Sequence, residues 1–217
     1  MTNAENPPAQ APEAESETML IDRYLPRFQA TQIEHAVVNA DIGTTWAALV
    51  DLDLLNVHSP LLDAAFFVRG LPSRVMTRLG RAPSAGATGP TALRLTGIDE
   101  HNLEGWLALG ERPGREVAFG AVGRFWKPNI EWYDVTTMTP EQFAAFDEAG
   151  WGKIAANFSL RQYGDERTLV SYEARTVTTD PDSAQKFARY WTVIRPFVGH
   201  VERAALATVR RDAERVG

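Results

Sequence analysis

The segment "SYEARTV" (residues 171–177) places two opposite charges, Glu173 and Arg175, two positions apart in a run typical of a β-strand. Side chains two apart on a strand point to the same face. On a face turned toward the interior, the pair would be mutually neutralising, and could orient a polar group of a ligand or act as a structural ion pair. On an exposed face it would contribute little to stability. The alternation of apolar and polar residues does not decide which face is turned inward, because apolar Leu169 lies on the face of the pair and Val170 on the other.

Other residues with chemical potential are scattered. Arg124, in "GRFWKP", could join the pair from a neighbouring strand or be exposed at a strand end. His58 could serve as a general acid–base at a cavity mouth, or could be a capping or surface histidine. The chain has no cysteine, which excludes disulfides and thiolate chemistry. The four histidines are not spaced as metal ligands, so no metal site is expected: they are His35, His58, His101 and His200.

Aromatic residues exceed what minimal packing of a core requires. Each one could belong to a plain core, because aromatic side chains bury large areas wherever they sit. As a set they could also line an apolar pocket in which a few polar groups orient a ligand. These residues are Trp46, Phe66, Trp106, Phe119, Trp126, Trp132, Phe158, Tyr190, Trp191 and Phe197.

The composition is that of an ordinary globular chain of 217 residues, long enough for one large domain. Residues 1–18 are acidic and Pro-rich, with four Glu and no Lys or Arg, and are expected to be a disordered tail before a single domain over 19–217. The tail carries four of the six net negative charges, which leaves −2 for the rest. This balance argues against a nucleic-acid partner. Without a long apolar run or a signal peptide, a cytoplasmic protein with no integral membrane association is expected.

Turn residues and periodicity divide the chain into short elements. A strand over 29–39 precedes a helix that Asp41 caps, and a second helix begins at Ser59, with Pro60 at its first position. Thr139 and Gln142 form a capping box for a small helix. The last two strands flank the turn "GDE" as a hairpin. After a Gly- and Pro-rich loop at 80–90, strands are expected at 91–98, 105–111, 115–122, 130–137, 153–163 and 167–178.

The last element is one long helix that begins at Asp180 and Pro181. A straight helix over 181–215 would be about 50 Å long, whereas a domain of this size has a radius of gyration of about 16 Å. Pro196 removes the hydrogen bond to the carbonyl of residue 192 and is expected to bend the helix without ending it. The apolar stripe supports this reading, because it continues past the proline: Phe187, Tyr190, Trp191, Ile194, Val198, Val201 and Ala205. The fold class is therefore α+β, with helices packed on one side of an antiparallel sheet.

This order of elements resembles the helix-grip fold of the SRPBCC superfamily, which includes START domains, polyketide cyclases and birch-pollen-allergen-like proteins. The segments "VVNADIGTTWAALVDLD", "EVAFGAVGRFWKP", "KIAANFSL", "SYEARTV" and "FARYWTVIRPFVGHVERAAL" are similar to uncharacterised bacterial members, and the resemblance covers residues 23–215. It implies a curved antiparallel sheet of about seven strands around the long bent helix, with two short helices after the first strand. An apolar cavity would lie between the sheet and the long helix. The resemblance also favours an inward orientation of Glu173 and Arg175.

Three functions are compatible with this architecture. The resemblance favours binding or carriage of a hydrophobic or aromatic small molecule without a cofactor. One alternative is an enzyme of the polyketide cyclase/dehydratase type, with proton transfer by Glu173, Arg175, Arg124 or His58, and another is a scaffold with a filled interior. Ligand identity and oligomeric state stay open. The ligand-binding residues expected are Trp106, Phe119, Arg124, Trp126, Phe158, Glu173, Arg175, Tyr190, Trp191 and Ile194.

Overall fold

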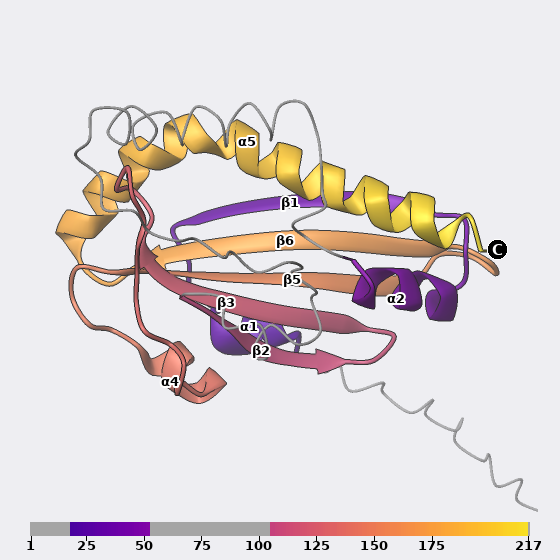
Figure 1. Cartoon of the computed structure of the whole chain (residues 1–217), viewed down its shortest axis with the longest axis horizontal. Helices are drawn as coiled ribbons and strands as arrows, with labels where there is room; N and C mark the ends of the chain where they lie inside the picture. The colour runs from indigo at the N-terminus through magenta and orange to yellow at the C-terminus, as the bar shows by residue number, and fades with distance from the viewer. Residues whose placement is uncertain (1–17, 53–104, 217) are drawn as a thin grey trace, which may run out of the picture.

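The structure, a computed structural model, describes residues 18–52 and 105–216 (Figure 1). The predictions for the tail over 1–17, for the second helix at Ser59, for His58, for the loop at 80–90 and for the strand at 91–98 lie outside these residues. Within them, the α+β class is confirmed: an antiparallel, curved sheet is combined with a long C-terminal helix, as in a helix-grip fold.

The sheet contains six strands within the described ranges, in the order β1-β6-β5-β3-β2, and β4 pairs with β3 at one end. All pairings are antiparallel, and β5 and β6 form the expected hairpin. The strands are β1 (Ala30–Val38), β2 (Trp106–Arg112), β3 (Glu116–Arg124), β4 (Glu131–Trp132), β5 (Gly152–Gln162) and β6 (Thr168–Thr178).

Two local predictions were inaccurate. The strand expected over 130–137 is reduced to the two residues of β4, because Asp134 Oδ1 accepts hydrogen bonds from the backbone and hydroxyl of Thr136 at 3.1 and 2.7 Å. Such a local turn competes with the pairing of strands. A short helix, α1 (Leu20–Tyr24), precedes β1 and was not predicted, since five residues are too few to show a helical period.

Helices cover both faces of the sheet, so the expectation of helices on one side only is wrong: the unpredicted α1 packs on the second face. On one face, here called the inner face, lie α2 (Ile42–Val50) and the C-terminal part of α5 (Pro181–Ala213). On the opposite, outer face lie α1 and α4 (Pro140–Ala145). Each face has its own core cluster. The inner core includes Phe119, Phe158 and Tyr172, and the outer core includes Leu109 and Phe143.

The helix caps follow the sequence predictions. Asp41 Oδ1 accepts from the backbone N–H of Thr44 at 3.0 Å, and Thr139 and Gln142 form the capping box of α4. Asp180 caps α5 by accepting from Ser183 N–H at 2.9 Å, and also accepts from Gly150 N–H at 2.6 Å. These hydrogen bonds, that of Ser183 first, lower the pKa of Asp180 to about 2.

Helix α5 is continuous through Pro196, which confirms that the proline does not end the helix. Its ribbon follows a curved path above the sheet, and its C-terminal part runs beside β1 (Figure 1). Arg195 Nε donates to Gln32 Oε1 at 3.3 Å, and near the end of the helix Glu214 accepts from Asn39 N–H at 2.9 Å. Helix and strand therefore run in the same direction.

Gly199 permits the close approach of α5 to β1. A Cβ atom at this buried position would lie 3.1 Å from both Gln32 Nε2 and Glu34 Oε1. We expect Gly199→Leu to destabilise the protein by about 1–2 kcal/mol, because overpacking outweighs the gain in helix propensity. Urea denaturation measures this loss, with Ala207→Leu at an exposed position of α5 as the control. Equal midpoints for both variants would show that α5 does not rest on β1 at Gly199.

Candidate functional site

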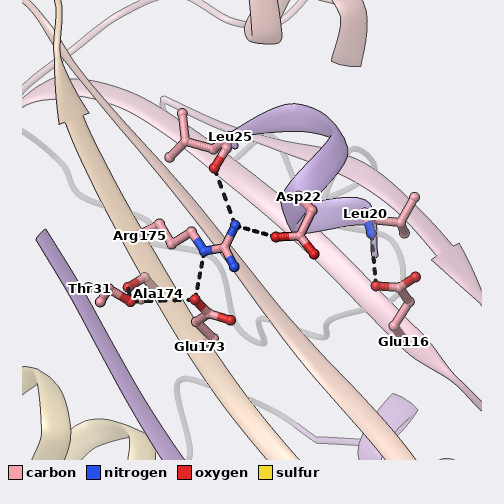
Figure 2. A network of polar contacts seen from close by, with 8 residues as sticks. All are labelled: Leu20, Asp22, Leu25, Thr31, Glu116, Glu173, Ala174 and Arg175. Carbon is pink, nitrogen blue, oxygen red and sulfur yellow. Dashed lines mark hydrogen bonds and ion pairs between the residues drawn. The ribbon is translucent and has the colours of Figure 1, made fainter. Parts of the chain in front are cut away.

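Glu173 and Arg175 lie on the outer face of β6, so the expected inward orientation is wrong. Arg175 donates to Glu173 Oε1 at 2.6 Å, to Asp22 Oδ1 of α1 at 2.7 Å and to the carbonyl of Leu25 at 3.4 Å (Figure 2). Burial opposes the charge of Arg175, but the two carboxylates outweigh it, and the pKa of the guanidinium is raised. Arg175 is buried and Glu173 partly buried, and the contacts of Arg175 with Asp22 and Leu25 join α1 to the sheet. A role in ligand binding stays a prediction.

Arg124 does not join this pair. Its guanidinium donates to the carbonyl of Gly150 at 2.9 Å and to Glu131 at 2.7 Å, and it lies 4.2 Å from the ring centre of Trp151. These contacts fasten the end of β3 to the segment that leads into β5.

Three of the predicted aromatic residues meet on the inner face. Phe119 lies 5.7 Å from Trp106 and 6.5 Å from Phe158, measured between ring centres. Phe158 in turn stacks on Tyr172 at 4.0 Å. Both Phe119 and Phe158 are fully buried, and Trp106 packs against their cluster. This wall of rings faces the C-terminal part of α5.

Trp46 of α2 also packs against the inner core, whereas the other predicted ligand-binding positions lie elsewhere. Tyr190 and Trp191 precede Pro196 on α5, where both pack against Phe187 with ring centres 6.2 and 5.8 Å apart. Ile194 and Trp126 are partly buried. None of these four predicted residues belongs to the inner core as the structure describes it.

The residue that the sequence analysis missed is Glu202, on the sheet-facing side of α5. Its side chain is 1% exposed, and among the residues that the structure describes neither carboxylate oxygen has a hydrogen-bond partner. It follows Gly199 by three positions and precedes Leu206 by four, and both of these residues are buried. A clue was present in the sequence: an acidic residue interrupts the apolar stripe between Val198 and Ala205.

The surroundings of Glu202 favour its neutral form. Burial raises its pKa to about 8, and the charges of Glu34 and, more weakly, Glu173 add to this effect, while Arg203 opposes it. Glu202 also adds to the effect of burial in raising the pKa of Tyr172. Near neutral pH the Glu202 side chain is therefore mostly a carboxylic acid, with one O–H donor and one carbonyl acceptor, both unused.

The strand register defines the surface that faces Glu202. Tyr172 on β6 is the direct pairing partner of Glu34 on β1 and of Phe158 on β5, so the three residues form one row across the sheet. In the next inner-facing row, two small residues, Ala174 and Ala156, stand between Gln32 and Phe119. The row of small residues therefore lies beside a row of rings under α5.

Polar contacts continue from this surface toward the edge of the sheet. Arg203 of α5 bonds Glu34, and Gln32 Nε2 donates to the same carboxylate oxygen of Glu34 at 3.2 Å. The carboxylate of Glu34 thus already has two donors, whereas that of Glu202 has none. In the part of the chain that the structure describes, no group of His, Asp and Glu is arranged to hold a metal ion, and no helix is long and apolar enough to cross a membrane.

Comparisons with known proteins assign this chain to no family. Neither a protein family nor a curated protein matches the sequence. Among solved structures, CalU16 from Micromonospora echinospora is similar over 85% of this chain and 84% of its own, with 12% identity and a TM-score of 0.27. A likeness at this level carries no conclusion about a ligand or an activity.

Proposed function

We propose that the protein binds or carries a hydrophobic or aromatic small molecule between the inner face of the sheet and α5, as a member of the SRPBCC superfamily. The observation that carries this proposal is Glu202, a buried acid that has no hydrogen-bond partner among the described residues and lies next to the apolar inner core. Buried polar groups are nearly always hydrogen-bonded, and an unsatisfied one costs about 1–3 kcal/mol. A ligand that bonds this acid while covering the aromatic wall would remove that cost.

Saturable binding of an apolar fluorescent probe tests the proposal. N-phenyl-1-naphthylamine should bind to the full chain with a stoichiometry of one and with fluorescence enhancement. We expect Ala174→Phe to lower its affinity at least tenfold, because the new ring occupies the inner face beside Tyr172 and Ala156.

The matched control is Ser171→Phe, on the outer face of the same strand, which should leave the affinity unchanged within about twofold. Equal affinity in wild type and Ala174→Phe would place the probe elsewhere and contradict the proposal. Organic extraction of the purified protein, followed by mass spectrometry, identifies any bound natural molecule.

A second candidate function is an enzyme of the cyclase/dehydratase type, which the pKa of Glu202 favours. An acid with a pKa of about 8 can donate and accept a proton near neutral pH. In deuterated buffer, such an enzyme would accelerate exchange of the methyl protons of 2-acetylnaphthalene, and Glu202→Gln would abolish the acceleration. Binding without accelerated exchange would favour carriage.

A further inference from the structure

The unused hydrogen-bonding groups of Glu202 specify what a ligand must offer. A neutral carboxylic acid donates through its O–H and accepts through its carbonyl oxygen, and here neither oxygen atom has a partner. Its side chain is 99% shielded from solvent. A ligand that supplied only hydrocarbon would leave both groups unsatisfied, whereas one oxygen atom of the ligand would satisfy the donor.

The charges around Glu202 disfavour an ionic ligand. An anion would be repelled by the negative charge of Glu34 on β1 and, more weakly, by that of Glu173 on the far side of β6. The positive charge of Arg203 on α5 is already bonded to Glu34. Tyr172 on β6 stays neutral because its pKa is raised. From α2, Leu49 is buried in the inner core, and the buried Thr45 hydroxyl donates to the carbonyl of Ala40 at 3.4 Å, so α2 adds no charge.

A cationic ligand is disfavoured for a different reason. It would require Glu202 to ionise, and both charges would then lose their hydration in the buried layer between the sheet and α5. The attraction within a buried ion pair repays this loss only with excellent geometry and further hydrogen bonds. The remaining polar groups nearby, Glu34, Gln32 and Arg203, are already bonded to one another.

The flat rings beside Glu202 specify the rest of the ligand. Phe158 and Tyr172 stack at 4.0 Å, and Phe119 lies 6.4 Å from Tyr172 between ring centres. Next to them, the inner-facing row of β5 and β6 carries the small side chains of Ala156 and Ala174. A planar aromatic body fits against such a wall better than a flexible chain, because ring contacts add to the area that is buried.

We propose that the Glu202 carboxyl donates a hydrogen bond to a carbonyl or hydroxyl oxygen of an uncharged aromatic ligand, and that this contact makes the site select neutral oxygen-bearing molecules over ammonium or carboxylate analogues. This inference rests on the proposed function, since it names the ligand class of the same site.

A matched series of naphthalene derivatives tests the selectivity. The probes are naphthalene, 2-acetylnaphthalene, 2-naphthylmethylammonium and 2-naphthoate, each measured at pH 6 by displacement of N-phenyl-1-naphthylamine from the full chain. We expect the ketone to bind about five- to tenfold more tightly than naphthalene, which corresponds to one neutral hydrogen bond. Both ionic probes should bind more weakly than naphthalene.

Substitutions and pH assign the preference to Glu202. In Glu202→Leu the ketone should lose its advantage over naphthalene. Glu202→Gln keeps an N–H donor and should retain most of the advantage. In the wild type the advantage should vanish between pH 6 and pH 9.5, since Glu202 has a pKa of about 8 and loses its proton in this range. In Glu202→Gln it should stay constant with pH, so the inference is testable even if the Leu variant does not fold.

The outcomes separate the two proposals. If naphthalene and the ketone bind equally, and Ala174→Phe blocks both, the binding function stands and the role of Glu202 is overturned. Tighter binding of the ammonium probe would likewise overturn it, because Glu202 would then act as an anionic counter-ion. If none of the neutral probes binds, the proposed function fails and the inference fails with it.

Discussion

Replacing Glu202 by leucine is expected to stabilise the folded protein by about 1 kcal/mol at pH 5 and by about 3–4 kcal/mol at pH 8. The gain at pH 5 reflects removal of a buried neutral acid that has no partner. The larger gain at pH 8 follows from proton linkage. Because the folded-state pKa is about 8 and the ordinary value 4.5, the unfolded chain releases this proton at a lower pH than the folded chain does.

The sign of the pH dependence follows directly. Below about pH 4.5, Glu202 is protonated in the folded and the unfolded state, so it does not change how the free energy of unfolding varies with pH. Between about pH 4.5 and pH 8 the folded protein holds one more proton than the unfolded chain, so the contribution of Glu202 to stability falls as the pH rises. The full difference in pKa corresponds to about 5 kcal/mol. Only about 3 kcal/mol of it is lost between pH 5 and pH 8, because the unfolded chain has already released part of this proton at pH 5 and the folded chain is still about half protonated at pH 8.

Urea denaturation at pH 5 and pH 8, with wild type and variant in parallel, measures both effects. The control is Glu166→Leu in the exposed turn between β5 and β6, which should change stability by less than about 0.5 kcal/mol at either pH. A Glu202→Leu variant that is less stable than wild type at both values would mean that the acid has a stabilising partner in the folded protein. A gain in stability would indicate that Glu202 is retained for binding rather than for folding.

The order of the elements was predictable because local signals fix it. Helices α2, α4 and α5 begin at caps that stand in the sequence as Asp41, Thr139 and Asp180. The hairpin of β5 and β6 follows from two long strand patterns around one short turn. Helix α1 was missed because its five residues are held by tertiary contacts, such as Leu20 N–H to Glu116 at 3.0 Å (Figure 2), rather than by propensity.

The site was less predictable, for two physical reasons. Apolar residues stand on both faces of β6, with Val170 on the inner face and Leu169 and Val177 on the outer face, so alternation alone does not orient the strand. Consequently Glu173 and Arg175 could not be assigned to a side. The partner that decides their orientation, Asp22, is 153 residues away from Arg175. Glu202 was overlooked because α5 carries charges on several faces, and only the packed structure shows which of them is buried.

Arg175→Met is expected to destabilise the protein by about 3 kcal/mol, although the arginine faces α1 and not the ligand layer. The arginine side chain is 11% exposed and that of Glu173 is 16% exposed. Removal of the guanidinium leaves Glu173 largely buried without its main partner, and breaks the bonds to Asp22 and Leu25. The matched control is Arg23→Met, which removes an arginine that belongs to α1 itself. Its guanidinium is 59% exposed and 3.7 Å from Glu141, so it should cost less than about 1 kcal/mol.

A double-mutant cycle separates the ion pair from the docking of α1. Glu173→Gln alone should cost about 1–2 kcal/mol, because Arg175 keeps the carboxylate of Asp22. The double variant Glu173→Gln/Arg175→Met should be more stable than the sum of the single losses implies, since neither charge is then left alone. Additive losses would show that the two residues act independently. If Arg175→Met melts like the wild type, α1 is held by Leu20, Ile21 and Tyr24 alone, and Arg175 would instead have to be tested as a residue that binds a ligand on the outer face.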